Sequence, residues 1–236
     1  MIIFSSIGEF SFATKAANIT SGNYEYSLNN SEATITKYIG SEKDVVISSK
    51  LDGYNVVAID SNAFRDTPIT NITIPSSVKE IGFRAFQNTK LKSINFPESL
   101  TYLGFSVFEN CKNLKDIYYA GSKESWSKIN ISSSSNDELY KAKIHYGKIF
   151  VKPSKVTKAT KKFSAKKLAV KIAKVPASSK YRIQVSTSKK FKKNIIDVTS
   201  KKTSLKFSSS KLKKKKTLYA RVQNSQVYNG KTLYSK

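Results

Sequence analysis

The sequence predicts a mainly β protein, in which a short solenoid with a capping hairpin is followed by a β-sandwich. Residues 44–121 repeat with a period of 22 residues. Residues 149–236 hold short alternating apolar and polar runs, divided by lysine- and serine-rich turns. The net charge also changes abruptly, from +1 over residues 1–148 (16 Lys+Arg against 15 Asp+Glu) to +25 over residues 149–236 (26 against 1). We therefore place a domain boundary near residue 149.

The repeat places the same residue types at the same offsets. Ala63-Phe64, Ala85-Phe86 and Val107-Phe108 occupy equivalent positions in successive copies. After each strand the chain should turn back along a return side, which starts at residues 78–81 and 100–103. We expect the glycine that follows, Gly82 or Gly104, to permit a tight bend, and the next apolar pair to enter the core as a helical turn. Three coils should stack, because one copy cannot bury its own apolar side. Their equivalent strands are predicted at residues 69–74, 91–96 and 114–119.

The segment before the repeat is predicted to cover its first coil. Residues 24–28 and 33–39 alternate around the turn residues 29–31, which is typical of a hairpin, and residues 44–48 form a further strand. Two interpretations of residues 1–17 remain open. They are either the remnant of a signal peptide whose start lies upstream, with Ser11-Phe12-Ala13 resembling a cleavage site, or a disordered N-terminus.

The second part of the chain is predicted to be a β-sandwich behind a linker over residues 150–155. The domains are thus residues 18–148, with caps at both ends, and residues 149–236. Strands are predicted around residues 168–172, 181–185, 196–198, 205–207 and 218–222.

Composition argues against catalysis and metal binding. Cys111 is the single cysteine and His145 the single histidine, so no disulfide, thiolate cluster or histidine cluster can form within the chain. We expect both side chains to serve packing, and Asp137-Glu138 to begin a short helix rather than to act as an acid–base pair. The sequence has no glycine-rich phosphate loop and no apolar run of about 20 residues. We therefore predict no enzyme activity, no cofactor, no metal and no transmembrane segment.

The repeat resembles a known bacterial family. Residues 46–64 (VISSKLDGYNVVAIDSNAF) and 74–86 (IPSSVKEIGFRAF) are similar to the leucine-rich repeat of BspA-type surface proteins, and residues 118–131 resemble the segment that closes such arrays. The similarity spans about residues 24–147. It implies a secreted or cell-surface location in a bacterium, and ligand binding or adhesion rather than catalysis.

Residues 152–236 resemble the fibronectin type III modules of Gram-positive surface proteins. The similarity lies in residues 152–156, 181–188 and 218–222, with Leu212 ahead of the last segment. The tryptophan usual in the second strand is replaced, with Ile172 in its place, and the tyrosine usual at the start of the sixth strand is Leu218. We also expect the chain to stop at Lys236, inside or just before the last strand, so that this domain is incomplete at its C-terminus.

The outward positions of the repeat strands are the predicted ligand-binding face. Short polar side chains and one aromatic ring on a rigid sheet suit hydrogen bonding to a glycan or a peptide; a merely soluble face is the alternative. Phe83 and Phe105 also align, and form either an apolar contact strip or a pair that packs on itself or a cap. Trp126 is expected in the cap. The predicted face consists of Asn71, Thr73, Ser93, Asn95, Asp116 and Tyr118.

The lysines predict contact with polyanions. In the strands they take outward positions, as Lys167 and Lys171 do beside Leu168 and Val170, and this alone would suit a solvated coat that protects the sheet edges. The near absence of acids favours polyanion binding instead. The basic residues of 149–236 are 24 lysines and 2 arginines, so polyanion binding should be weakly selective and sensitive to salt. The predicted polyanion-binding residues are Lys189, Lys190, Lys192, Lys193, Lys213, Lys214, Lys215 and Lys216.

The sequence therefore favours a non-enzymatic, secreted or cell-surface binding protein. Its repeat domain would contact a protein or glycan ligand, and its basic domain anionic cell-wall or host polymers. Two alternatives stay open: a nucleic-acid-binding protein without sequence specificity, and an accessory region of a larger cell-wall-active enzyme. No specific nucleic acid is expected as a partner, because lysine does not provide the paired base contacts of arginine.

Overall fold

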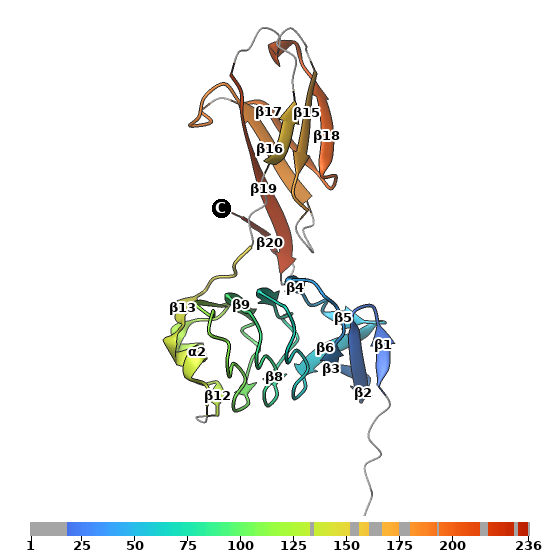
Figure 1. Cartoon of the computed structure of the whole chain (residues 1–236), viewed down its shortest axis with the longest axis vertical. Helices are drawn as coiled ribbons and strands as arrows, with labels where there is room; N and C mark the ends of the chain where they lie inside the picture. Colours follow the sequence, from blue (N-terminus) through green and yellow to red (C-terminus); the bar gives the residue numbers. More distant parts are fainter. Residues whose placement is uncertain are drawn as a thin grey trace, which may run out of the picture.

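The computed structural model describes residues 18–132, 135–151, 156–160, 167–174, 180–192, 194–212, 217–228 and 231–235 (Figure 1). The predictions for residues 1–17 and for most of the linker lie outside these residues. Two separate hydrophobic clusters hold the described chain together. One extends from Tyr26 to Ala142 and the other from Leu168 to Leu212. We refer to residues 18–148 as the repeat region and to residues 149–236 as the C-terminal region.

A five-stranded parallel sheet forms one side of the repeat region. The predicted repeat strands are present, and their register follows the sequence spacing. Asn71 pairs with Ser93, 22 residues on, and Ser93 with Asp116, 23 residues on. Strands from both caps join them, so the stack is deeper than the three coils expected from the sequence. The strand order is β13 (Lys143–Tyr146), β11 (Asp116–Tyr119), β9 (Ser93–Phe96), β7 (Asn71–Thr73) and β4 (Asp44–Val46).

The return sides of the coils form the opposite sheet, which has eight strands. Its central members pair in parallel and are only two residues long, because each coil turns again at once. The order is β1 (Ile19–Ser21), β2 (Tyr24–Asn29), β3 (Glu32–Tyr38), β6 (Tyr54–Ile59), β8 (Glu80–Ile81), β10 (Tyr102–Leu103) and β12 (Asn130–Ile131), with β5 (Lys50–Leu51) paired to β6.

The predicted hairpin caps the first coil, as expected. Its turn uses Asn30 and Ser31, both at positive φ, which suits a two-residue hairpin loop. The Tyr38 ring stacks on Phe64 at 5.1 Å, and the Tyr38 backbone N–H donates to Ala63 O at 2.7 Å. Tyr38 therefore continues the aromatic column and the coil-to-coil hydrogen bonds into the cap.

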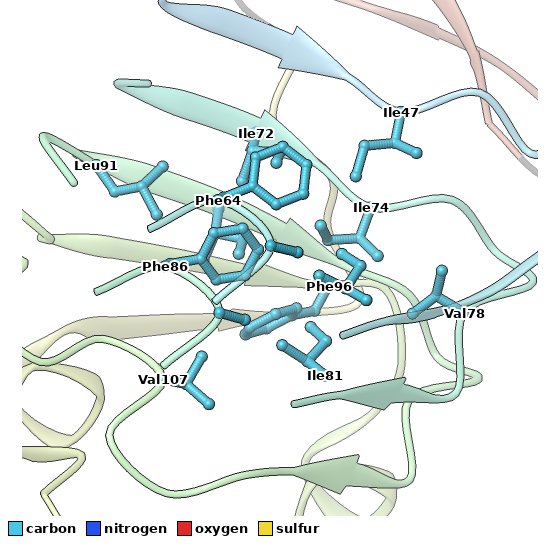
Figure 2. Close-up of a cluster of buried hydrophobic side chains, with 14 of the residues drawn as sticks. Ile47, Phe64, Ile72, Ile74, Val78, Ile81, Phe86, Leu91, Phe96 and Val107 are labelled. Atoms are coloured by element: carbon cyan, nitrogen blue, oxygen red, sulfur yellow. The ribbon is translucent and has the colours of Figure 1, made fainter. Parts of the chain in front are cut away.

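A column of phenylalanine rings fills the interior between the two sheets (Figure 2). Phe64 and Phe86 lie 5.3 Å apart and Phe86 and Phe108 5.7 Å, one ring from each coil. All three rings are fully buried. The predicted equivalence of these residues is confirmed. Each buried ring makes a large apolar contribution to the stability of its coil.

The segment that carries each ring is a pair of tight turns, and the predicted helical turn is wrong. Arg65 N–H bonds to Asn62 O and Thr67 N–H to Phe64 O, so the hydrogen bonds join residues three apart. Residues at both ends of the segment have positive φ, and they recur with the period of the repeat as Asn62, Arg84 and Ser106, then Asp66, Asn88 and Asn110. These left-handed residues bring the backbone out of helical geometry and leave its amides free to bond from coil to coil.

Gly82 and Gly104 serve close approach between coils and not the predicted bend. Neither has a positive φ. A Cβ on Gly104 would lie 2.9 Å from the backbone of Gly82 and Phe83, and one on Gly82 would lie 2.7 Å from Ser61 N. Hydrogen bonds from Gly82 N to Ile59 O and from Gly104 N to Ile81 O draw the same backbones together. Glycine is therefore required because any side chain would enter the neighbouring coil.

Two short helices and β13 close the far end of the stack. The helices are α1 (Lys123–Trp126) and α2 (Asp137–Lys141), and α2 begins with the acidic pair as predicted. Trp126 packs at 5.2 Å from Tyr119 and 6.1 Å from Phe96, which confirms its place in the cap. The buried Asn136 donates from Nδ2 to Gly104 O at 2.9 Å and accepts at Oδ1 from Val107 N at 2.9 Å. Its amide thus bonds the cap to the backbone of the last coil.

Replacing Asn136 with alanine should reduce the free energy of unfolding by about 3 kcal/mol, because a buried carbonyl and a buried N–H lose their partner. Urea titration of the full chain measures this. Asn130→Ala is the matched control, since Asn130 is exposed in β12 and should change stability by less than about 0.5 kcal/mol. Equal effects of the two substitutions would contradict the capping role of Asn136.

The C-terminal region contains two antiparallel sheets. One has the order β14 (Val156–Thr160), β15 (Lys167–Ile172) and β18 (Ser204–Ser208); the other has the order β17 (Asn194–Ser200), β16 (Lys180–Ser186), β19 (Tyr219–Tyr228) and β20 (Lys231–Tyr234). Apolar residues of β15 and β16 share one cluster with Leu212, from the short 3-10 helix Ser210–Leu212. The five strands predicted from sequence are present, and Lys167 and Lys171 are exposed beside the buried Leu168 and Val170, as expected.

Two strands of this region were not predicted. β14 begins directly after the segment expected to be the linker, and β20 pairs with the last four residues of β19, from Ser225 to Tyr228. β19 is also twice as long as the predicted run, because it continues past Val222 through polar residues. This extension carries β19 and β20 down to the repeat region (Figure 1).

Candidate functional site

The six residues of the predicted ligand-binding face lie on neighbouring strands of the parallel sheet, as the spacing indicated. Asn71, Ser93 and Asp116 form one row across β7, β9 and β11, and Thr73, Asn95 and Tyr118 form the next. Side chains of each row bond to one another. Ser93 Oγ donates to Asn71 Oδ1 at 2.7 Å, and Asn95 Nδ2 donates to Thr73 Oγ1 at 2.8 Å.

The start of the linker lies across the second row. Phe150 N–H donates to Asn95 Oδ1 at 2.8 Å, and Asn95 Nδ2 donates to Phe150 O at 2.8 Å. The Phe150 ring stacks on Tyr118 at 5.2 Å, and Tyr118 stacks in turn on His145 at 4.6 Å. The side-chain amide of Asn95 therefore forms two hydrogen bonds with the backbone of an extended segment, and this segment belongs to the protein itself.

Burial divides the predicted face into two parts. Thr73, Ser93 and Asn95 are buried, with at most 8% of their surface exposed, whereas Asn71, Asp116 and Tyr118 remain partly exposed. In this arrangement a ligand reaches only the second group. The binding role of the face stays a prediction. Sequence reasoning missed Phe150, although the apolar run Ile149-Phe150-Val151 within a lysine-rich stretch could have indicated that this segment packs.

The residues considered for chemistry have structural roles. His145 Nε2 lies 2.7 Å from Asp116 Oδ1, at the edge of the polar rows. Cys111 is buried, its Sγ donates to Phe86 O at 3.0 Å, and burial raises the pKa of its thiol, which keeps it protonated and unreactive. No group of three or more metal-ligating side chains occurs in the described part of the chain. Nor does any helix among those residues have the length and apolarity needed to span a membrane.

Phe83 and Phe105 pack against each other, with ring centroids 4.5 Å apart. The Arg84 guanidinium covers Phe83 at 4.4 Å, so a single ring, Phe105, keeps 45% of its surface exposed. The two rings therefore form the self-packed pair of the alternative, while Phe105 stays half exposed. A contact role for this pair stays a prediction.

The lysines of the C-terminal region lack acidic partners within that region. Its one acid, Asp197, accepts both Arg182 Nε and Arg182 Nη2 at 2.8 Å, and Gln184 Nε2 at 2.7 Å. The hydrogen bonds from Arg182 and Gln184 lower the pKa of Asp197 to about 2. Arg182 thus compensates the negative charge of Asp197, and Asp197 does not neutralise any of the lysines.

The described part of the first predicted lysine cluster lies at one end of the four-stranded sheet. Lys189, Lys190 and Lys192 are exposed after β16, and Ser186 at the end of β16 pairs with Tyr219 at the start of β19. The start of β19 therefore lies beside the lysine turn that follows β16, at the end of the sheet distant from the repeat region (Figure 1). Lys193 and Lys213–Lys216 lie outside the described residues.

Comparisons with known proteins agree with the fold of the repeat region. Residues 34–151 match the BspA type leucine rich repeat region in 6 copies. Among solved structures, a leucine rich cell surface protein from Faecalibacterium prausnitzii is 29% identical over 45% of this chain and 34% of its own, with a TM-score of 0.41. A leucine-rich repeat protein from Bacteroides capillosus is 27% identical over 49% of this chain and 88% of its own, with a TM-score of 0.43.

The chain thus spans about a third of the length of the F. prausnitzii protein. Among curated proteins, none matches at a significant level. The match begins within β3, at residue 34, and includes all stacked strands after it and the segment up to Val151 that lies across the polar face. The protein belongs to the family of BspA-type leucine-rich repeat proteins.

Proposed function

We propose that the protein is a non-enzymatic binding protein of the bacterial cell surface or its surroundings, in which the C-terminal region holds anionic polymers. The observation that carries this proposal is the segregation of charge. Residues 149–236 carry a net charge of +25, and their one carboxylate is engaged by Arg182. A domain of this size and charge attracts polyanions over distances of about 10 Å at moderate salt.

The type of basic residue indicates how selective the contact is. Lysine presents a compact point charge, whereas paired recognition of phosphates or bases favours arginine. With 24 lysines and 2 arginines, the region suits repeating anionic polymers such as wall teichoic acids, anionic lipids or acidic glycans. Nucleic acid would bind by the same non-specific attraction.

We further propose that the C-terminal region is a fibronectin type III-like module. Seven strands in two antiparallel sheets of three and four, with the second and third strands in different sheets around one apolar cluster, support this assignment. The repeat region then offers a separate surface for a protein or glycan ligand. Its candidates are the partly exposed members of the polar rows and the exposed ring of Phe105.

Retention of the full chain on immobilised teichoic acid should fall steeply as NaCl is raised, and simultaneous replacement of Lys189, Lys190 and Lys192 by glutamine should reduce the slope of log K against log salt by about 2–3. Column retention or calorimetry at several salt concentrations measures this. The matched control replaces Lys112, Lys115 and Lys128 of the repeat region, which are equally exposed.

If the control substitutions weaken retention as much as the C-terminal ones, the assignment of polyanion binding to the C-terminal region is wrong. Duplex DNA of two unrelated sequences provides the second arm of the experiment. Equal binding of both duplexes and of teichoic acid supports the non-specific attraction proposed here. Preference for one duplex at physiological salt would instead support the nucleic-acid-binding alternative.

A further inference from the structure

The two arginines of the C-terminal region lie on the same face of its four-stranded sheet. Ile183 and Val185 of β16 are buried in the apolar cluster, so the alternate residues Arg182 and Gln184 face the other side of the sheet. β19 pairs with β16 so that Arg221 lies directly opposite Gln184. Arg182 is therefore a diagonal neighbour of Arg221 on this outer face.

The two guanidinium groups differ in their partners. Arg182 donates from Nε and Nη2 to the Asp197 carboxylate, both at 2.8 Å, so a carboxylate already occupies its fork. Arg221 is exposed and donates from Nε to Gln184 Oε1 at 2.7 Å. Within the described residues, Nη1 and Nη2 of Arg221 have no hydrogen-bond partner. The end of this guanidinium therefore keeps two donors in the geometry that matches two oxygens of one oxyanion.

A chain of hydrogen bonds orients the Arg221 guanidinium. Gln184 Nε2 donates to Asp197 Oδ2 at 2.7 Å, which leaves Oε1 of the same amide to accept from Arg221. Gln184 keeps only 8% of its surface exposed, so its side chain is confined by its neighbours. Asp197 is the only acid of the C-terminal region. This chain gives that single carboxylate a positioning role, because it orients an arginine through one glutamine.

The ring of Phe191 supports the same guanidinium from the lysine turn. Its centroid lies 4.4 Å from Arg221 Cζ, within the range of a cation–π contact. Phe191 has a φ of +51°, a left-handed conformation that is costly for a bulky residue and persists only where the surroundings hold it. Lys190 and Lys192 flank it in the chain, and both are exposed. The turn that places a ring on Arg221 therefore also presents two lysines.

We propose that Arg221 binds a phosphodiester group of an anionic polymer, with Nη1 and Nη2 each donating to one non-bridging oxygen. The inference rests on the polyanion binding proposed above and adds one directed contact to it. Phosphate suits both kinds of basic residue at this site, because lysine binds it as a point charge and arginine as a fork. The guanidinium is oriented before binding, so less rotamer entropy is lost. At the bacterial cell surface, the fitting polymer is a polyol phosphate such as wall teichoic acid.

The test is calorimetric titration of the full chain with an oligomer of about ten glycerol phosphate units in about 0.15 M NaCl. Arg221→Lys keeps the charge and removes the fork, so the affinity should fall about five- to tenfold while the slope of log K against log salt stays the same. Arg65→Lys is the matched control. Arg65 belongs to the repeat region and has 42% of its side chain exposed, and its replacement should change the affinity less than about twofold.

The supporting residues are tested by the same titration. Phe191→Leu removes the ring and should weaken binding about threefold, and Phe191→Tyr should recover the lost affinity because it keeps a ring on the guanidinium. Gln184→Met leaves the net charge unchanged and removes the acceptor of Arg221 Nε, so it should also weaken binding about threefold. Equal losses with Phe191→Leu and Phe191→Tyr would contradict the supporting role of the ring.

Equal affinity of Arg221→Lys and the wild type would overturn the inference, and so would an equal loss with Arg65→Lys. Salt-dependent retention on teichoic acid would then still support the wider polyanion proposal, whereas no retention at low salt would contradict both. A hyaluronate oligomer with the same number of charges is the second arm, and an equal loss with this carboxylate polymer would contradict the choice of phosphodiester. Oligothymidylate is the third: tighter binding of it, with the same dependence on Arg221, would contradict the choice of a polyol phosphate.

Discussion

Phe86→Ala should lower the free energy of unfolding of the repeat region by about 3–5 kcal/mol. Phe86 is the middle ring of the column, 5.3 Å from Phe64 and 5.7 Å from Phe108, and it is fully buried. Truncation removes its apolar burial and leaves a cavity between two coils that backbone hydrogen bonds hold at a fixed spacing. The surrounding structure therefore cannot collapse into the space, which places the loss in the upper part of the range.

Urea or thermal unfolding, followed by circular dichroism, measures this loss. Total stability of a domain is about 5–15 kcal/mol, so the substitution removes a large share of it. Phe105→Ala is the matched control, because this ring is half exposed and touches one other ring; its loss should be about 1 kcal/mol. Similar losses for Phe86 and Phe105 would mean that the column does not hold the coils together.

The sequence predicted the repeat region well because its information is periodic. Each coil has apolar residues at the same offsets. The predicted position of one residue can therefore be checked against the equivalent residues of the other copies. Ile72 and Ile94, for example, pair in register and are both buried. The caps were also predictable, because the hairpin before the repeat alternates cleanly around Asn30 and Ser31.

Contacts made once, between distant segments, were not predictable. Asn95 and Phe150 are 55 residues apart, and no periodic signal connects them. Nor does any pattern in the sequence indicate that the Asn136 side chain reaches Gly104, 32 residues away. The lower part of β19 escaped prediction for another reason. Its polar residues Asn224, Ser225 and Gln226 do not alternate with apolar ones, and they are buried where this strand pairs with β16 and β20.

These single contacts change the view of the binding face. The polar rows were predicted as a free surface, and the structure shows that Phe150 already occupies the middle of it. The same linker leads to the C-terminal region, whose strand β19 lines a cavity beside β4. Surfaces at the junction of the two regions therefore depend on residues from both.

Gly104→Ala should destabilise the repeat region by about 3 kcal/mol, and the size of the loss separates two explanations of why glycine recurs at residues 82 and 104. A methyl group at residue 104 would lie 2.9 Å from the Gly82 carbonyl carbon and from Phe83 N. Both are backbone atoms held by coil-to-coil hydrogen bonds, so they cannot move aside as a flexible side chain would. Relief requires a shift of one coil against the next, which costs energy at the upper end of the usual range for overpacking.

Gly53→Ala provides the comparison, measured by the same urea titration. Gly53 has a φ of +94° and no atom within 4 Å of the position that an added methyl group would take, so alanine there meets only backbone strain, worth about 1 kcal/mol. If glycine at residue 104 served a bend, as the sequence suggested, its replacement would cost no more than that of Gly53. A loss at Gly104 two to three times that at Gly53 is expected instead, because what glycine provides there is room for the neighbouring coil.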